Sequence, residues 1–73
     1  MVKKQTKTRR QEIGELIRRL RIEAEMLQVD LAKAIGAFQS DVCNWEAGRR
    51  HIPVSKARML AKVFDHDAIE FID

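Results

Sequence analysis

The stretch IGAFQSDVCNWEAG, residues 35–48, decides the fold of this chain. Its two glycines, Gly36 and Gly48, can both adopt the positive φ angle with which many helices end. Between them, Val42 and Trp45 lie three residues apart and therefore share one face of a helix. When this face packs inward, small side chains remain outside: Gln39, Ser40, Cys43 and Asn44.

Apolar residues on both sides of this stretch recur at the three- and four-residue spacing of amphipathic helices. Upstream, residues 11–26 predict a first helix, whose inward face consists of Ile13, Leu16, Ile17, Leu20, Ala24 and Leu27. A short second helix follows, and its apolar side consists of Leu31, Ala32 and Ile35. Downstream of Pro53, which favours a helix start, a fourth helix has an apolar face of Ala57, Leu60, Ala61 and Phe64.

The C-terminal segment predicts one more short helix. Asp67 and Glu70 have the spacing of a capping box, and the residues after them include Ile69, Phe71 and Ile72. The β-branched alternation typical of strands is absent from the sequence. The predicted fold is therefore all-α, a compact bundle of five short helices. Residues 11–73 form one domain, preceded by a flexible basic N-terminal arm at residues 1–10.

Composition limits the classes of protein that these 73 residues can represent. A single cysteine excludes a disulfide within the chain, and without metal-like Cys and His spacing we expect no metal and no cofactor. The basic, polar start is unlike a secretory signal or a membrane span, which predicts a cytoplasmic protein with no membrane partner. Residues 1–21 carry eight Lys or Arg against two Glu, whereas residues 65–73 carry four acids and no Lys or Arg. This asymmetry indicates a polyanionic partner near the N-terminal end, or a basic tail that serves solubility alone.

Two short helices joined by a glycine turn, the second with small polar side chains outside, are typical of a helix-turn-helix. Its second helix enters the major groove of DNA. From residue 28 to residue 48 the sequence resembles the phage repressor and Cro-type helix-turn-helix family, also described as XRE-like transcriptional regulators. The matching residues are Gln28, Leu31, Ala32, Gly36, Val42, Trp45, Glu46 and Gly48, and Leu60 and Ala61 extend the match. The resemblance covers about residues 12–72.

Three outward side chains of the helix at about residues 39–46 are candidates for base recognition. Gln39 and Asn44 each carry a hydrogen-bond donor and an acceptor, so either can pair with the N6 and N7 edge of adenine. Ser40 can bond to several bases, or to a phosphate alone. The alternative is an ordinary solvated helix face.

Other residues are candidates for the DNA backbone and for the architecture of the motif. The resemblance implies that Gln28, together with the amides at the start of its helix, binds a phosphate. Arg49 and Arg50 directly follow the predicted recognition helix and are candidates for a second phosphate contact, against simple solvation. The resemblance also implies that Arg21 and Glu46 pair across the fold, either as a partly buried architectural pair or as an exposed one.

The sequence departs from the family where Ser or Thr N-caps are usual, because Leu27 and Phe38 occupy those positions. Either the helices start elsewhere, or phosphate oxygens accept from the uncapped amides. We favour packing of Phe38 against a neighbouring helix over contact with a thymine methyl group. Asp41 would be repelled by phosphate unless it accepts from a cytosine amino group or lies away from the groove. Cys43 is interpreted as a passive small residue that can touch DNA rather than as a redox switch, because neighbouring carboxylates disfavour a reactive thiolate.

Together these features predict a DNA-binding transcriptional regulator, a repressor, that binds a palindromic operator as a homodimer. One recognition helix per subunit would enter successive major grooves, with half-sites roughly 34 Å apart. Part of the terminal face of Ile69, Phe71 and Ile72 would meet the twofold mate, or these residues serve the core alone. The alternative function is an antitoxin-like or bridging protein-interaction module with the same fold. No nucleophile and base pair or phosphate-binding glycine loop marks an enzyme, and no small-molecule effector is predicted.

Overall fold

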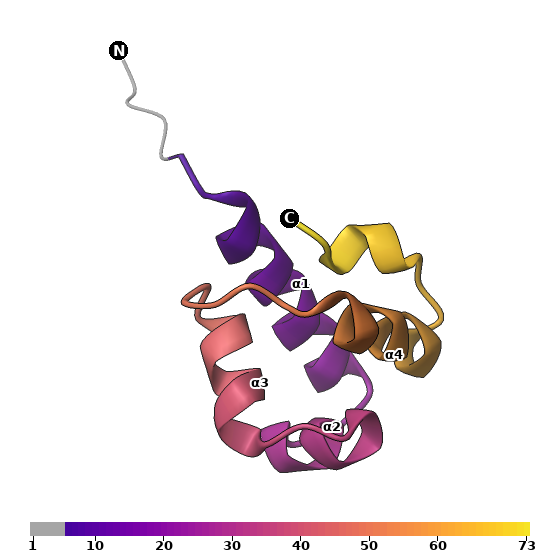
Figure 1. The fold of residues 1–73 in the computed structure, drawn as a ribbon. Coiled ribbons are helices and arrows are strands. Elements are labelled where there is room, and N and C mark those ends of the chain that lie inside the picture. The colour runs from indigo at the N-terminus through magenta and orange to yellow at the C-terminus, as the bar shows by residue number, and fades with distance from the viewer. Residues whose placement is uncertain (1–5) are drawn as a thin grey trace.

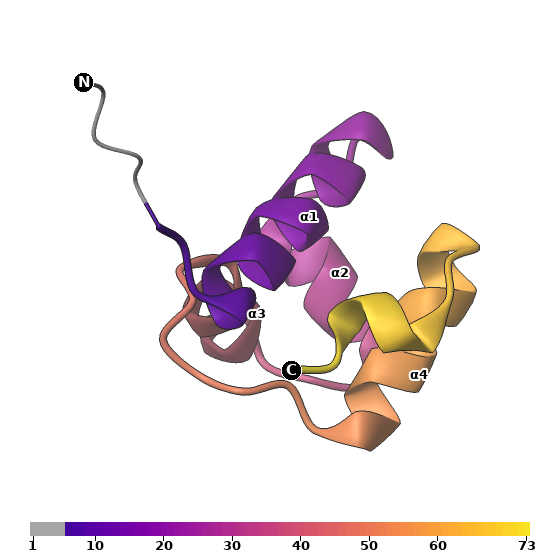
Figure 2. The same cartoon turned by 90° about the horizontal axis from the view of Figure 1, so that it is seen from above.

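Four α-helices and one 3-10 helix make up residues 6–73, the part of the chain that this computed structural model describes. In order they are α1 (Arg9–Glu23), α2 (Gln28–Ile35), α3 (Gln39–Glu46), α4 (Val54–Phe64) and η1 (Ala68–Phe71). No strand occurs within this range, and the predicted all-α class is confirmed. α3 packs against both α1 and α2, whereas α4 and η1 lie together on the other side of α1 (Figure 1). The view from above shows the same division (Figure 2).

The first helix begins and ends earlier than the predicted residues 11–26. Thr8 is its N-cap: its hydroxyl accepts from the backbone N–H of Gln11 at 3.1 Å, and the Gln11 side chain accepts from the Thr8 N–H at 2.9 Å. This capping box satisfies two amides at the helix start, so Arg9 and Arg10 belong to α1 and not to the arm. The predicted arm otherwise falls largely on residues 1–5, which lie outside the described part of the chain.

One hydrophobic core joins the elements. Its buried side chains are Ile13, Ile17, Leu31, Ala32, Ile35, Val42, Trp45, Ile52, Ala57, Leu60 and Phe71. Leu16, Leu20, Ala61 and Phe64 are partly buried against it. The predicted inward faces of α2 and α3 are therefore correct. At the end of α1 the prediction is wrong, because α1 stops at Glu23 and leaves Ala24 and Leu27 exposed in the turn that follows.

Two glycines allow the close arrangement of the first three helices. Gly36 ends α2 with a φ of 68°, as predicted for the turn, and α3 begins three residues later. The Lys56 ammonium of α4 donates to the carbonyls of Ile35 and Gly36 at 3.0 Å, which ties this turn to the next helix. Gly14 has a different role, because a β-carbon there would overlap backbone carbonyl oxygens of α3. The backbones of α1 and α3 therefore approach each other directly.

The predicted last helix is a single 3-10 turn. Glu70 accepts from the backbone N–H of Asp67 at 3.4 Å, which is one half of the predicted capping box. Phe71 is fully buried in the core, whereas Ile69 is 64% exposed, so Ile69 is the part of this face that stays available for the predicted twofold contact. The Arg9 guanidinium donates to the carbonyls of this turn, including that of Ile69 at 3.1 Å, and links both ends of the described chain. None of the helices within residues 6–73 is long and apolar enough to cross a membrane.

Candidate nucleic-acid interface

The arrangement of α2, its glycine turn and α3 is that of a helix-turn-helix. Val42 is fully buried and Trp45 is 5% exposed, and these two side chains anchor α3 to the core. Ala32, a small residue on the predicted apolar side of α2, is 2% exposed. α3 lies at the edge of the molecule with its other side toward solvent (Figure 1). The separation of an anchored face from a free face, predicted for residues 39–46, is confirmed.

The three candidates for base recognition lie on this free side of α3. Gln39 and Ser40 are exposed in the first turn, and Asn44, one helical turn after Ser40, is partly buried. Cys43 is a partly buried free thiol at the same helical position as Gln39, one turn further on. The structure therefore gathers the polar side chains that the sequence singled out on one accessible helix face.

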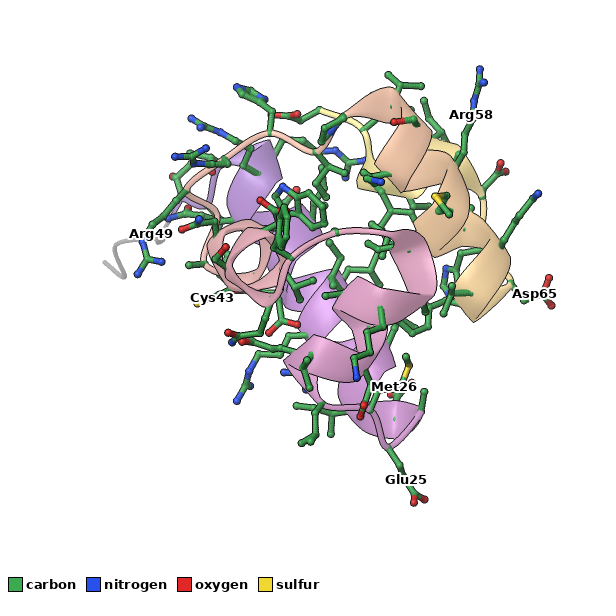
Figure 3. The ribbon with its side chains drawn as sticks, turned by 60° about the horizontal axis from the view of Figure 1, so that its bottom comes forward. Glu25, Met26, Cys43, Arg49, Arg58 and Asp65 are labelled. Carbon is green, nitrogen blue, oxygen red and sulfur yellow. The ribbon has the colours of Figure 1, made fainter. Side chains whose placement is uncertain are left out.

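The two candidate phosphate-binding arginines are exposed in the loop after α3. The backbone N–H of Arg49 donates to the carbonyl of Asn44 at 2.9 Å, and its guanidinium approaches the Asn44 side-chain oxygen at 3.4 Å. Arg49 and Cys43 lie on the same side of the molecule, whereas Arg58 belongs to α4 on the opposite side (Figure 3). Positive charge thus borders the C-terminal end of the free face.

Arg21 and Glu46 form the pair that the family resemblance implies. The Arg21 Nε donates to one Glu46 oxygen at 2.6 Å and its Nη2 donates to the other at 3.0 Å. Only 11% of the Arg21 side chain and 5% of the Glu46 side chain are exposed, so the pair is the partly buried alternative. The hydrogen bond to Glu46 raises the pKa of the Arg21 guanidinium further above its usual range, and the cation stays charged. α1 and α3 are thereby joined by charge as well as by packing.

Gln28, the candidate phosphate ligand of α2, has two partners within the protein. Its Nε2 donates to a Glu46 carboxylate oxygen at 3.1 Å, and its Oε1 accepts from Gln39 Nε2 at 2.8 Å. One N–H of the Gln28 amide remains for a further acceptor. The sequence did not predict the contact between Gln28, a phosphate-binding candidate, and Gln39, a base-reading candidate. These two side chains meet only because α2 and α3 cross.

The helix starts do not shift to compensate for the missing Ser and Thr caps. Leu27 and Phe38 are the N-caps of α2 and α3, and an aspartate three residues later accepts each N-cap N–H. The distances are 2.9 Å for Asp30 and 3.0 Å for Asp41. This contact gives Asp41 a structural role, and its signal was the same three-residue spacing that we applied only to the C-terminal turn. Phe38 is 77% exposed, so the favoured interpretation that it packs against a neighbouring helix is wrong.

Within residues 6–73 no group of three His, Cys, Asp or Glu side chains is placed to hold a metal ion. Both histidines instead face carboxylates: His51 Nδ1 lies 2.8 Å from Asp73 Oδ1, and His66 Nδ1 lies 3.1 Å from Glu70 Oε1. These pairs lower the pKa of Asp73 and of Glu70, chiefly through the hydrogen bonds from the imidazoles. The first pair includes a residue of the loop after α3 and the second lies beside η1, so both histidines are outside α3.

Among comparisons with known proteins, the one with solved structures is informative. No family model and no curated protein matches the chain. Among solved structures the chain is similar to the restriction-modification controller protein C.AhdI from Aeromonas hydrophila, with 27% sequence identity and a TM-score of 0.77. The similarity covers 86% of this chain and 96% of that protein. The likeness therefore extends over most of this chain and nearly the whole of that protein.

Proposed function

Because the chain has the motif and the fold of the phage repressor and Cro-type helix-turn-helix regulators, we propose that it is a repressor that binds a palindromic operator as a homodimer. The observation that carries the proposal is the division of α3. Val42 and Trp45 fix the helix to the core, while Gln39, Ser40 and Asn44 remain accessible on the other side. A helix held in this way can enter the major groove without unfolding any part of the core.

The chemistry of the free face suits base recognition flanked by phosphate contacts. Gln39 and Asn44 carry amides that can recognise adenine in the major groove, and Ser40 adds a hydroxyl at the start of the same helix. Arg49 and Arg50 can neutralise phosphates at one end of α3, and the remaining N–H of Gln28 can reach one at the other. Each neutralised phosphate steepens the salt dependence of binding by about 0.9 units of logarithmic slope.

A homodimer follows from the small size of this surface. One helix of eight residues contacts few base pairs, too few to select one site among many genomic competitors. Two subunits related by a twofold axis double the contacts and require an operator with inverted half-sites. Ile69, exposed on η1, is our candidate for the mutual surface, with the partly buried Ile72 beside it. Sedimentation should then give a dimer on DNA, and a monomer at high micromolar concentration, both free and bound, would refute this part.

The test is selection of bound sequences from a random duplex library at near-physiological salt. The wild-type protein should enrich an inverted repeat. The Gln39→Ala, Asn44→Ala double variant should bind DNA with a similar salt slope but enrich no sequence. Arg58→Ala is the matched control, because it removes a cation from α4 on the side opposite Arg49 and should enrich the wild-type repeat.

Two other outcomes would separate this proposal from its rival. When neither wild type nor variant enriches a sequence, the fold serves an antitoxin-like or bridging protein-interaction module. Enrichment of an unrepeated site would keep sequence recognition and reject the twofold arrangement. The likeness to a controller protein favours the regulator over the interaction module.

A further inference from the structure

Four side chains from three helices form a continuous hydrogen-bonded series, which we call the amide network: Arg21, Glu46, Gln28 and Gln39. It begins at the buried guanidinium of Arg21 in α1 and passes through Glu46 at the end of α3. Gln28 at the start of α2 continues it, and it ends at the exposed Gln39. The buried end is fixed by two bonds from Arg21 to Glu46, at 2.6 and 3.0 Å.

The network has only one possible polarity. A carboxylate can accept hydrogen bonds but cannot donate them, so Gln28 must turn its NH2 group toward Glu46. The Gln28 carbonyl oxygen then faces the other way, and Gln39 must donate its own NH2 group to it, as the 2.8 Å contact records. Consequently the Oε1 atom of Gln39 is left as an acceptor, together with the second N–H of the same amide.

We propose that Glu46, held by Arg21, is a positioning residue that fixes the orientation of the Gln39 amide and thereby sets a preference for adenine over guanine. This inference rests on the proposed function. Adenine offers an N6 donor and an N7 acceptor, which match the free oxygen and the remaining N–H of Gln39. Guanine offers two acceptors, N7 and O6, so the oriented Gln39 oxygen would face an acceptor without a proton between them.

The environment of the pair supports a positioning role beyond the joining of two helices. A buried ion pair adds little net stability over apolar packing, because both charges must be desolvated. Apolar side chains could therefore join α1 to α3, but they could not orient an amide. An acceptor-only group is the feature that Gln28 requires, and Glu46 supplies it with 5% of its side chain exposed. Water competes little for such a group.

The experiment compares two operators that differ only at one base pair. The position is identified first, as the one whose preference is lost in Gln39→Ala. Dissociation constants are then measured for adenine and for guanine at this position. Wild type should prefer adenine by about 5- to 150-fold, the range for one bidentate contact. Glu46→Gln keeps the size of the side chain but introduces an NH2 group, so Gln28 and Gln39 are free to turn over, and the ratio should fall to about threefold or less.

Two further variants keep the test decisive. Gln28→Met breaks the network while leaving the Arg21–Glu46 pair in place, and it should reduce the adenine to guanine ratio in the same way. If Glu46→Gln fails to fold, the result with Gln28→Met decides. Ile17→Val in the core is the control for lost stability and should keep the wild-type ratio. An adenine to guanine ratio within about twofold of wild type in Glu46→Gln, with affinity lowered equally for both operators, would overturn the inference. A wild-type protein without any sequence preference would instead overturn the proposed function.

Discussion

Replacement of Gly14 by alanine tests whether the contact between α1 and α3 outweighs helix propensity. In the interior of an exposed helix this change stabilises by about 1 kcal/mol, because glycine loses more conformational freedom on folding than alanine. Gly14 is in the interior of α1, but it is buried. Its added β-carbon would lie 2.6 Å from the carbonyl oxygen of Glu46 and would also overlap the carbonyl oxygen of Trp45.

The magnitude follows from what would have to move. The obstructing atoms are backbone atoms on α3, which Val42 and Trp45 hold in the core, so neither side can yield as a flexible side chain would. Overpacking of this kind costs roughly 1–3 kcal/mol, and the backbone obstruction places Gly14→Ala at the upper end. After the gain of about 1 kcal/mol from propensity, we expect a net loss of about 2 kcal/mol. For a chain of this size the midpoint of thermal unfolding should fall by roughly 8–16 °C.

Thermal unfolding followed by circular dichroism measures this loss directly. Arg18→Ala, an exposed change on the same helix, is the control and should shift the midpoint little. The displacement of α3 should also weaken operator binding, measured well below the unfolding midpoint. A Gly14→Ala protein that unfolds at or above the wild-type temperature would refute the argument, because the helices would then have room for the β-carbon.

Three further changes have definite expected outcomes. Lys56→Met removes the ammonium from the carbonyls at the end of α2 and should destabilise by about 1 kcal/mol in urea unfolding, whereas an unchanged midpoint would mean that water replaces it. The pKa of Glu70 is lowered in the folded state, chiefly by the hydrogen bond from His66, so the ionised carboxylate stabilises the fold above its ordinary pKa of 4.5 and this stabilisation is lost as the pH falls below 4.5. Glu70→Gln should therefore flatten the decline of the unfolding free energy at acid pH. Parallel curves for wild type and variant would contradict the pairing. Leu27→Ser should raise the unfolding free energy by about 1 kcal/mol, because the serine hydroxyl completes a capping box with Asp30. If phosphate oxygens accept from the uncapped amides at the start of α2, the same change should weaken DNA binding, and an unchanged operator affinity would show that phosphate does not use these amides.

Local pattern was sufficient to predict the helix-turn-helix itself. The apolar positions Leu31, Val42 and Trp45 are set by helical periodicity and by a glycine that must adopt a positive φ, and all three are buried as expected. Periodicity failed at the ends of α1, where capping chemistry decides. Thr8 and Gln11 carried the signal of a capping box, but the basic composition around them favoured an arm.

Contacts between helices were beyond the reach of pattern alone. Nothing near Gly14 in the sequence indicates that the end of α3 will lie against it, because that requirement arises from the crossing of two helices. The exposure of Phe38 was missed for a related reason. An aromatic ring at a helix start is expected to pack, and only the arrangement of α2 and α3 leaves it 77% exposed. Both features belong to tertiary geometry.

The same limit explains why residue type alone cannot assign the bases that α3 would contact under the proposed function. Gln39 and Asn44 carry the same amide group, and residue type alone does not distinguish them. Their partners differ: Gln39 donates to Gln28, whereas the Asn44 oxygen accepts from Arg49 at 3.4 Å, so within the described residues the Gln39 oxygen and the Asn44 NH2 group remain for other partners. An exposed oxygen suits a base-edge donor such as adenine N6, and an exposed NH2 group suits an acceptor such as N7 or O6. Under the proposed function, the base preference of each position would therefore be set by the hydrogen bond that its amide makes within the protein. The bond from Gln39 to Gln28, at 2.8 Å, would hold its amide more firmly than the longer bond between Asn44 and Arg49.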